Sequence, residues 1–197
     1  MTQLVWAIDN LVSIGSHRTE VLGVPKVIET PAGKATEFDG KQAGLVVGTH
    51  PLAGAERFTV EAIFRPDAGG LNEQRFLHIQ EEGSENRILL ETRLTEDEQW
   101  FLDTFIRSNE TKQALFAEGF KHPVGQWHHA ALVFDGYEMR HYVNGLKELS
   151  HEIVFTPQRN GRTSLGVRLN QVSWFHGAIR VVRFTFDALP PQEFLRP

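Results

Sequence analysis

Apolar side chains recur at every second position along most of the chain, and this spacing limits the folds that the chain can adopt. The stretch FTVEAIFRP places Phe58, Val60, Ala62 and Phe64 on one side and Thr59, Glu61, Ile63 and Arg65 on the other. Side chains of a β-strand point to alternate faces, whereas a helix repeats every 3.6 residues. We therefore predict that this segment is a half-buried strand that ends at Pro66.

The same alternation predicts nine further strands between turn residues. They lie at Leu45–Val47, Phe76–Gln80, Ile88–Leu94, Trp100–Arg107, His128–Phe134, Met139–Asn144, Glu152–Phe155, Ser164–Leu169 and Ala178–Phe186. The pairs Asp39-Gly40, Asp135-Gly136, Asn144-Gly145 and Asn160-Gly161 supply tight turns. Short helical pieces are expected only near Ile8 to Ile14, at His50 to Gly54 and at the QEFL segment after Pro191. Many strands without helical crossovers predict an all-β fold, an antiparallel two-sheet sandwich or jelly roll.

Length and composition fit one domain over residues 1–197, because sandwiches of about 200 residues commonly form a single core. The net charge is −5 with both signs interspersed, so no basic stripe is available for nucleic acid. No apolar run is long enough to cross a membrane, and the first residues do not resemble a signal peptide. We expect a cytoplasmic protein as the sequence stands, or an extracellular one if a leader has been removed. Zero cysteines exclude disulfides and thiolate metal sites.

Three segments together resemble a known family. The pattern GQWHHAALVFDGYEMRHYVNG, followed by SLGV and by WFHGAIRVVRFTFDALPPQEF, resembles laminin G-like jelly-roll domains of the concanavalin A-like lectin/glucanase superfamily. The stretches FDGKQAGLVV and FTVEAIFRP look like the earlier strands of that family. The resemblance runs from about Phe38 to the C-terminus and implies the jelly-roll fold.

The resemblance leaves the activity open, since the superfamily includes sugar-binding modules, protein-binding modules and glycan-cleaving enzymes. Family members often carry an acidic residue after the isoleucine of the G-x-I strand, and this chain has Arg180 there. A calcium ion or polar contact cannot be transferred to that position by analogy.

Charged and aromatic side chains within the predicted strands are the first candidate ligand site. The set comprises Arg75, His78, Glu91, Arg93, Trp100, Asp103, Arg107 and Arg140. An aromatic plane beside arginines and carboxylates is suited to a sugar, and an arginine can hold the carboxylate of an acidic sugar. Cross-strand ion pairs, such as Glu91 with Arg93 and Asp103 with Arg107, are the alternative explanation. Strict alternation would put Arg75 and His78 on opposite faces unless a bulge intervenes.

A loop near Arg168, Asn170 and Trp174 is a second candidate for ligand contact, although Trp174 and Phe175 are expected to pin it onto the core. Trp127 is expected to cap the core. Adjacent residues of a strand point to opposite faces, so His128 and His129 cannot bind one metal ion together. We predict that His129 is partly buried and hydrogen-bonded to a backbone carbonyl or a neighbouring strand, and that His128 lies on the opposite surface.

Glycan hydrolases need two carboxylates that flank the scissile bond. Glu96 and Glu98 have alternate spacing, but their densely polar surroundings favour a solvated hairpin tip. Asp9, Asp39 and Asp187 could meet if the terminal strands pair, and their oxygen atoms would suit Ca²⁺. An Asp39-Gly40 turn accounts for Asp39 without a metal ion.

These observations favour a non-catalytic, lectin-like domain that binds a polysaccharide or oligosaccharide. A glycan-active hydrolase or lyase that uses His78, Glu91, Arg93 or Asp103 is the first alternative. A protein-interaction or structural module, including weak self-association, is the second. No carboxylate pair combines a strand position with alternate spacing, so binding is favoured over catalysis.

Overall fold

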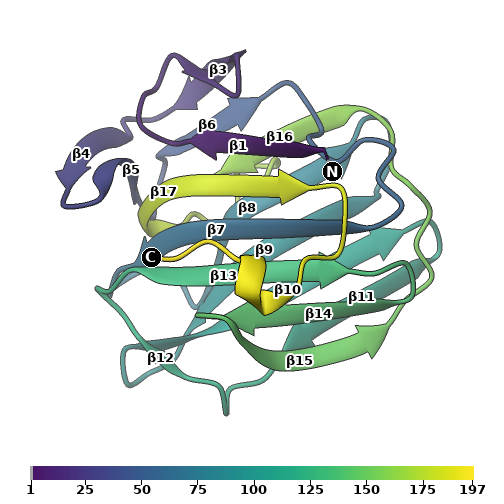
Figure 1. The fold of residues 1–197 in the computed structure, drawn as a ribbon. Coiled ribbons are helices and arrows are strands. Elements are labelled where there is room, and N and C mark those ends of the chain that lie inside the picture. The colour runs from purple at the N-terminus through teal and green to yellow at the C-terminus, as the bar shows by residue number, and fades with distance from the viewer. Residues whose placement is uncertain (1) are drawn as a thin grey trace.

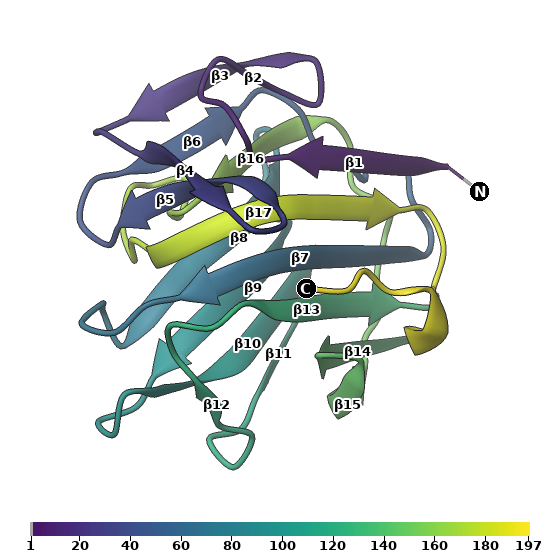
Figure 2. The same cartoon turned by 60° about the vertical axis from the view of Figure 1, so that its left-hand side comes forward.

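The computed structural model describes residues 2–197 and contains two antiparallel sheets packed face to face (Figures 1 and 2). This is the predicted sandwich. The first, here called the β7 sheet, has the order β15-β14-β13-β7-β17-β5-β4, and β1 also pairs with β17. The second, the β9 sheet, has the order β11-β10-β9-β8-β16-β6-β3-β2, and β12 also pairs with β10. Consecutive strands from β8 to β11 form neighbouring hairpins, which gathers residues 73–116 on one sheet.

The strand bounds are as follows. The β7 sheet contains β1 (Gln3–Ala7), β4 (Lys26–Thr30), β5 (Gly33–Asp39), β7 (Phe58–Pro66), β13 (His128–Phe134), β14 (Glu138–Val143), β15 (Leu146–Glu152) and β17 (His176–Thr185). The β9 sheet contains β2 (Ser13–Ile14), β3 (His17–Leu22), β6 (Gly44–Val47), β8 (Glu73–Glu81), β9 (Arg87–Leu94), β10 (Gln99–Ser108), β11 (Thr111–Phe116), β12 (His122–Pro123) and β16 (Gly161–Leu165).

Aromatic rings join the two sheets at the centre of the core. Phe64 of β7 stacks on Phe76 of β8 with ring centroids 4.2 Å apart. The same Phe64 ring meets Trp100 of β10 edge-on at 5.2 Å and Phe175 at 6.2 Å. Each fully buried ring stabilises the fold by roughly 1.5–3 kcal/mol through the area that it removes from water. Phe58, Val60, Ala62 and Phe64 of β7 all belong to the core, as predicted. The strand is not half-buried, however, because Thr59, Glu61 and Ile63 on its other face are buried as well.

The C-terminal segment covers part of the outer face of the β7 sheet. After β17 the chain forms one 3₁₀ turn, η1 (Pro191–Glu193), and then passes in front of β13 (Figure 1). Leu189 and Phe194 pack there with Tyr142 in a second, smaller apolar cluster. Beneath the segment, buried Glu61 accepts hydrogen bonds from His129 (3.0 Å) and the Leu195 amide (2.8 Å), and it pairs with Arg183.

Several local predictions differ from the structure. Residues 8–14 are not helical, because the Asn10 side chain accepts hydrogen bonds from the amides of Val12 and Ser13 and closes a turn. His50 to Gly54 forms turns, whereas the predicted turn at QEFL is present as η1. The strand predicted at Glu152–Phe155 lies earlier in the chain, as β15, which ends at Glu152. The strand predicted at Ser164–Leu169 is β16, which ends at Leu165, so residues 166–175 form a loop.

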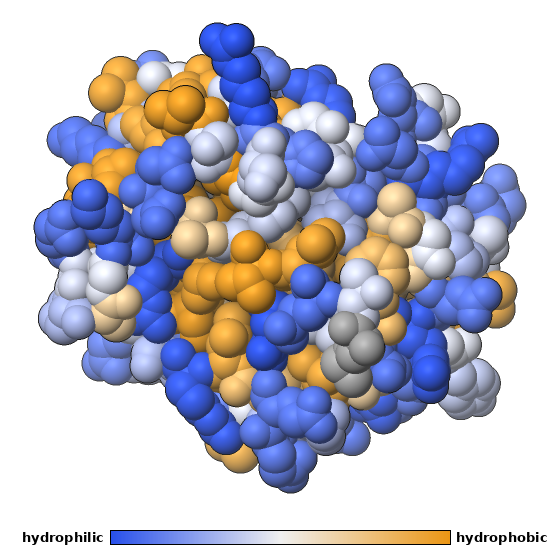
Figure 3. Space-filling view, turned by 45° about the horizontal axis from the view of Figure 1, so that its top comes forward, coloured by the Kyte–Doolittle hydropathy of each residue, from blue (hydrophilic) through white to orange (hydrophobic). Residues whose placement is uncertain are grey.

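The alternation does not predict the N-terminal strands β1 to β5, nor β11 or β12, and in β1, β3 and β4 most apolar side chains are at least partly exposed. Exposed apolar residues in this part of the chain are Leu4, Val5, Val12, Val21, Val24 and Val27. Figure 3, with this end turned toward the reader, shows apolar patches among hydrophilic side chains. No helix in residues 2–197 has the length and apolar character needed to span a membrane.

Glu61→Gln is expected to lower the free energy of unfolding by about 3 kcal/mol, because Arg183 would lose its buried negative partner. The one amide oxygen of glutamine also cannot accept from His129, Arg183 and the Leu195 amide as the two carboxylate oxygens do. Glu29→Gln is the matched control, since Glu29 pairs with Lys34 at an exposed site and should change stability by less than about 1 kcal/mol. Urea unfolding of both variants measures the difference. Equal, small losses would show that Glu61 does not anchor the C-terminal segment.

Candidate functional site

The outer face of the β9 sheet carries a cluster of charged strand residues. Arg75 of β8, Glu91 of β9 and Asp103 of β10 are direct cross-strand partners. Glu73 and Arg93 form the next row. Of the eight ligand-binding residues predicted from the sequence, six lie on this face: Arg75, His78, Glu91, Arg93, Asp103 and Arg107.

A β-bulge places Arg75 and His78 on the same face. The pairing of β8 with β9 shifts between Arg75 and Leu77, so Arg75 opposes Glu91 while His78 opposes Leu89. Glu91 and Leu89 are two residues apart and therefore share a face. The extra residue is Phe76, which packs in the core. The bulge thus removes the conflict that strict alternation predicts.

Five residues form a connected ladder of ion pairs, called here the charged ladder: Glu73, Arg75, Glu91, Arg93 and Asp103. Arg75 pairs with Glu91 and, at 3.2 Å, with Glu73. Arg93 Nη1 lies 2.8 Å from Glu73, and Arg93 Nε lies 2.7 Å from Asp103 Oδ2. Cross-strand ion pairing is therefore present, with partners other than those predicted.

Burial makes this ladder electrostatically unusual. The side chains of Glu91 and Asp103 are only 5% and 2% exposed. Burial, followed by the charge of Asp103, raises the pKa of Glu91 to about 7 despite its pairing with Arg75. Burial also raises the pKa of Asp103. A protonated Glu91 can donate a hydrogen bond to Asp103, whose Oδ1 has no other partner within residues 2–197.

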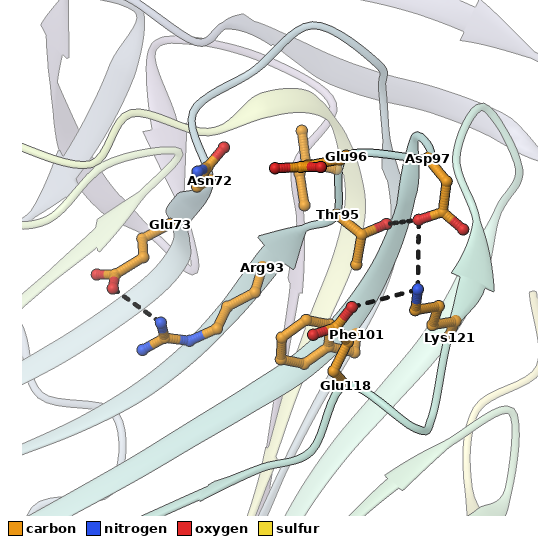
Figure 4. Close-up of a pocket in the computed structure, with 10 residues that line it drawn as sticks. Asn72, Glu73, Arg93, Thr95, Glu96, Asp97, Phe101, Glu118 and Lys121 are labelled. Atoms are coloured by element: carbon orange, nitrogen blue, oxygen red, sulfur yellow. Dashed lines mark hydrogen bonds and ion pairs between the residues drawn. The ribbon is translucent and has the colours of Figure 1, made fainter.

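Two depressions adjoin the charged ladder and share Arg93. The first, here the acidic depression, has a volume of about 620 Å³ and lies where the β8 and β9 ends meet the β9–β10 turn (Figure 4). Four carboxylates line it against two cations, Arg93 and Lys121; the carboxylates belong to Glu73, Glu96, Asp97 and Glu118. Lys121 bridges Asp97 (3.3 Å) and Glu118 (3.2 Å), as Figure 4 shows.

The second, here the arginine depression, has a volume of about 140 Å³. Its lining consists of Arg75, Arg87, Leu89, Glu91, Arg93, Asp103, Phe105, Ala114 and Arg168. Arg168 comes from the loop 166–175, which the sequence indicated as a candidate. That loop is attached to β8, since the Leu169 amide donates to His78 Nδ1 (3.0 Å) and Arg75 donates to Ser173 Oγ (2.5 Å).

The structure separates two predicted ligand-binding residues from this face. Trp100 is 0% exposed and faces the core, where its indole N–H donates to the Pro123 carbonyl (3.2 Å), so it cannot stack on a sugar. Arg140 lies on β14 of the other sheet and pairs with Asp135 (2.8 Å). The two errors have different causes. Trp100 and Asp103 are three residues apart on β10, so alternation itself puts them on opposite faces, whereas the sequence does not show that the strand of Arg140 joins the other sheet. Phe116 is the exposed ring on this face, and Arg93 lies 4.7 Å from its centre.

The remaining loop candidates have different surroundings. Asn170 is exposed, and Phe175 is fully buried as expected, while Trp174 is only half-buried. Glu96 and Glu98 belong to the tight turn between β9 and β10, where Glu98 has φ +54. This is the predicted hairpin tip.

The tryptophan and histidines at the start of β13 are packing groups. Trp127 does not cap the core; it is half-buried with the guanidiniums of Arg65 and Arg180 each 5.7 Å from its ring. His128 and His129 do face opposite sides. His128 is in the interior against Trp100 rather than on the surface, and His129 is covered by the C-terminal segment.

The three aspartates considered for calcium are used in other ways. Asp39 accepts hydrogen bonds from three backbone amides of its own turn, which lower its pKa although burial acts to raise it. Asp187 lies 3.6 Å from Arg57, and Asp9 accepts from Asn10. Within residues 2–197, no three histidine or carboxylate side chains are grouped to hold a metal ion, so the structure does not assemble the predicted set.

Comparison with protein families gives a match over residues 39–194 to the model described as "Concanavalin A-like lectin/glucanases superfamily". Comparison with curated proteins gives no match.

Solved structures share the fold at low sequence identity. Domain 4 of AbnA, a GH43 extracellular arabinanase from Geobacillus stearothermophilus in complex with arabinotriose, has a TM-score of 0.72 and 20% identity, with 96% of this chain and 94% of that chain covered. A heptameric SAP-like pentraxin from Limulus polyphemus has a TM-score of 0.62 and 16% identity, with 80% and 77% covered. The binding domain of botulinum neurotoxin DC in complex with SialylT has a TM-score of 0.69 and 9% identity, with 97% and 49% covered.

The raised pKa of Glu91 predicts a specific pH dependence of stability. The folded protein retains a proton that the unfolded chain releases, so this group lowers the free energy of unfolding as pH rises from about 4.5 to about 7. Glu91→Gln stays neutral, and its stability relative to wild type should rise by up to about 3 kcal/mol across that window.

Glu73→Gln is the control of opposite sign. Burial acts to raise the Glu73 pKa, but the charges of Arg93 and Arg75 outweigh it and lower the pKa, so this variant should lose relative stability as pH rises. Urea unfolding at several pH values measures the free energy of unfolding of both variants and of wild type. If the free energies of Glu91→Gln and wild type differ by the same amount at every pH, Glu91 does not have a raised pKa.

Proposed function

The chain belongs to the concanavalin A-like lectin/glucanase superfamily, and from this we propose that it is a carbohydrate-binding domain whose glycan site is the outer face of the β9 sheet. The observation that carries the proposal is the pair of depressions that share Arg93 on one continuous sheet face. Both depressions are lined by hydrogen-bonding side chains and by an aromatic ring, and a sugar-binding site requires both kinds of contact.

The aromatic part of the proposed site comprises Phe116, Phe105 and Phe101. Phe116 is 50% exposed beside Arg93, Phe105 lines the arginine depression, and Phe101 lines the acidic depression. The face of an aromatic ring carries negative potential and attracts the C–H groups of a sugar ring. Exposed Phe116 is therefore the proposed stacking platform in place of the buried Trp100.

The polar part of the site is held rigidly before a ligand binds. Arg75, Arg93, Glu91 and Asp103 are fixed by their mutual ion pairs, so sugar hydroxyls would meet groups that lose little conformational entropy on binding. Structures of similar fold support a glycan as the ligand class, since one contains arabinotriose and another SialylT. Arabinose oligosaccharides are accordingly among the first probes.

Glycan cleavage is a second candidate, favoured by the Glu91 pKa of about 7, which suits a general acid. Binding without cleavage remains the stronger proposal because Arg75 and Arg93 already hold both Glu91 and Asp103. Product analysis after prolonged incubation with oligosaccharides separates the two functions. Products that wild type forms and Glu91→Gln does not would establish cleavage.

Phe116→Ala should weaken oligosaccharide binding about tenfold, because it removes the stacking surface and leaves the fold intact. Calorimetric titration against a panel of neutral and acidic oligosaccharides measures the affinity.

Leu146→Ala is the matched control, since Leu146 is a 74% exposed apolar residue on β15 of the other sheet. It should bind like wild type, and both variants should keep the wild-type melting temperature. The proposal fails if no glycan binds wild type, or if the two variants bind equally.

A further inference from the structure

Three guanidiniums gather at one end of the outer face of the β9 sheet. Arg87 and Arg107 are cross-strand partners of β9 and β10, and Arg168 lines the same depression as Arg87. Burial lowers the pKa of Arg87, and the positive charges of Arg168 and Arg107 lower it further. The ion pairs of Arg87 and Arg107 are both to one exposed carboxylate, Glu85, at 3.1 and 3.6 Å. The cluster therefore has more positive charge than its own partner neutralises.

Arg168 is held over the depression without an acidic partner. Within residues 2–197, no carboxylate lies within ion-pair distance of its guanidinium. Its backbone belongs to a tight turn, in which the Gln171 amide donates to the Arg168 carbonyl (2.8 Å) and the Arg168 amide to the Val172 carbonyl (3.2 Å). The next amide, of Leu169, donates to the buried ring of His78. This turn places a free cation beside the ligand surface before binding.

The other end of the face has the opposite charge. The acidic depression presents four carboxylates against two cations. A long polyanion that lies along the face would be repelled by these carboxylates. This repulsion would weaken the binding of nucleic acid or of a uniformly sulfated polymer. A glycan with one anionic group and otherwise neutral sugar rings fits both ends of the face, because the anionic group can bind the arginine depression while neutral hydroxyls contact the carboxylates of the acidic depression.

We propose that the arginine depression is a subsite for one acidic group of the glycan, a carboxylate or a sulfate ester, bound by Arg168 and Arg87. A guanidinium binds either group through paired, charge-assisted hydrogen bonds. The neighbouring hydroxyls of the sugar would face Glu91 and Asp103 on the same floor. This inference rests on the proposed function and narrows its ligand to an acidic glycan.

The test compares sugars that differ only in charge. Calorimetry at low salt with a trisaccharide that contains a single galacturonate residue, and with the methyl ester of that trisaccharide, measures the contribution of one carboxylate, and a trisaccharide with one sulfate ester tests the sulfate alternative. Wild type should bind one of the two acidic sugars at least about tenfold more tightly than the methyl ester. Raising the salt concentration should reduce this preference.

Arg168→Gln should reduce the preference for the acidic sugar at least about threefold, because Arg87 remains, while its affinity for the neutral ester changes less than about twofold. Arg162→Gln is the matched control, because Arg162 lies on neighbouring β16, pairs with Glu20 and does not line the depression. Arg168→Lys should restore part of the preference.

Two failures are distinguishable. Equal affinity for acidic and neutral sugars, unchanged in Arg168→Gln, would overturn the anionic subsite while the proposed glycan site stands. Absence of binding to every sugar, including the neutral panel, would overturn the proposed function and this subsite together.

Discussion

The stacking of Phe64 on Phe76 is the contact on which the rest of the structure depends. It joins β7 to β8 across the sandwich at 4.2 Å, and Trp100 and Phe175 complete the aromatic centre around it. Because these rings must face inward, every second residue of the surrounding strands is directed outward. The outer positions of β8, β9 and β10 are then free to carry charge.

Phe76 also determines the arrangement of the polar face. It is the extra residue of the β8 bulge, and its inward packing turns both Arg75 and His78 outward. Arg75 then pairs with Glu91, and His78 accepts the loop hydrogen bond that positions Arg168. The inward packing of Phe76 thus brings together residues of β8, of the β9–β10 hairpin and of the loop 166–175, and these residues form the charged ladder and the arginine depression.

The sequence predicts the fold well because alternation is strong in the central strands. It also predicts the group Arg75, Glu91, Arg93 and Asp103, since these residues alternate with apolar neighbours on consecutive strands. Alternation also separates Trp100 from Asp103, because the two lie three residues apart on β10 and so face opposite sides. Alternation does not tell which of the two faces inward, because that depends on which side of β10 meets the other sheet. The edge strands near the N-terminus were missed for a related reason: β3 and β4 bury few side chains, so their alternation is weak.

The central claim is that a glycan binds the outer face of the β9 sheet. The most direct measurement is a titration of isotope-labelled protein with an oligosaccharide, followed by NMR chemical shifts of the backbone amides. Binding at this face predicts shifts concentrated in β8 to β11 and residues 168–173, with little change in β13 to β15. Shifts confined to the β7 sheet or to the N-terminal strands would contradict it.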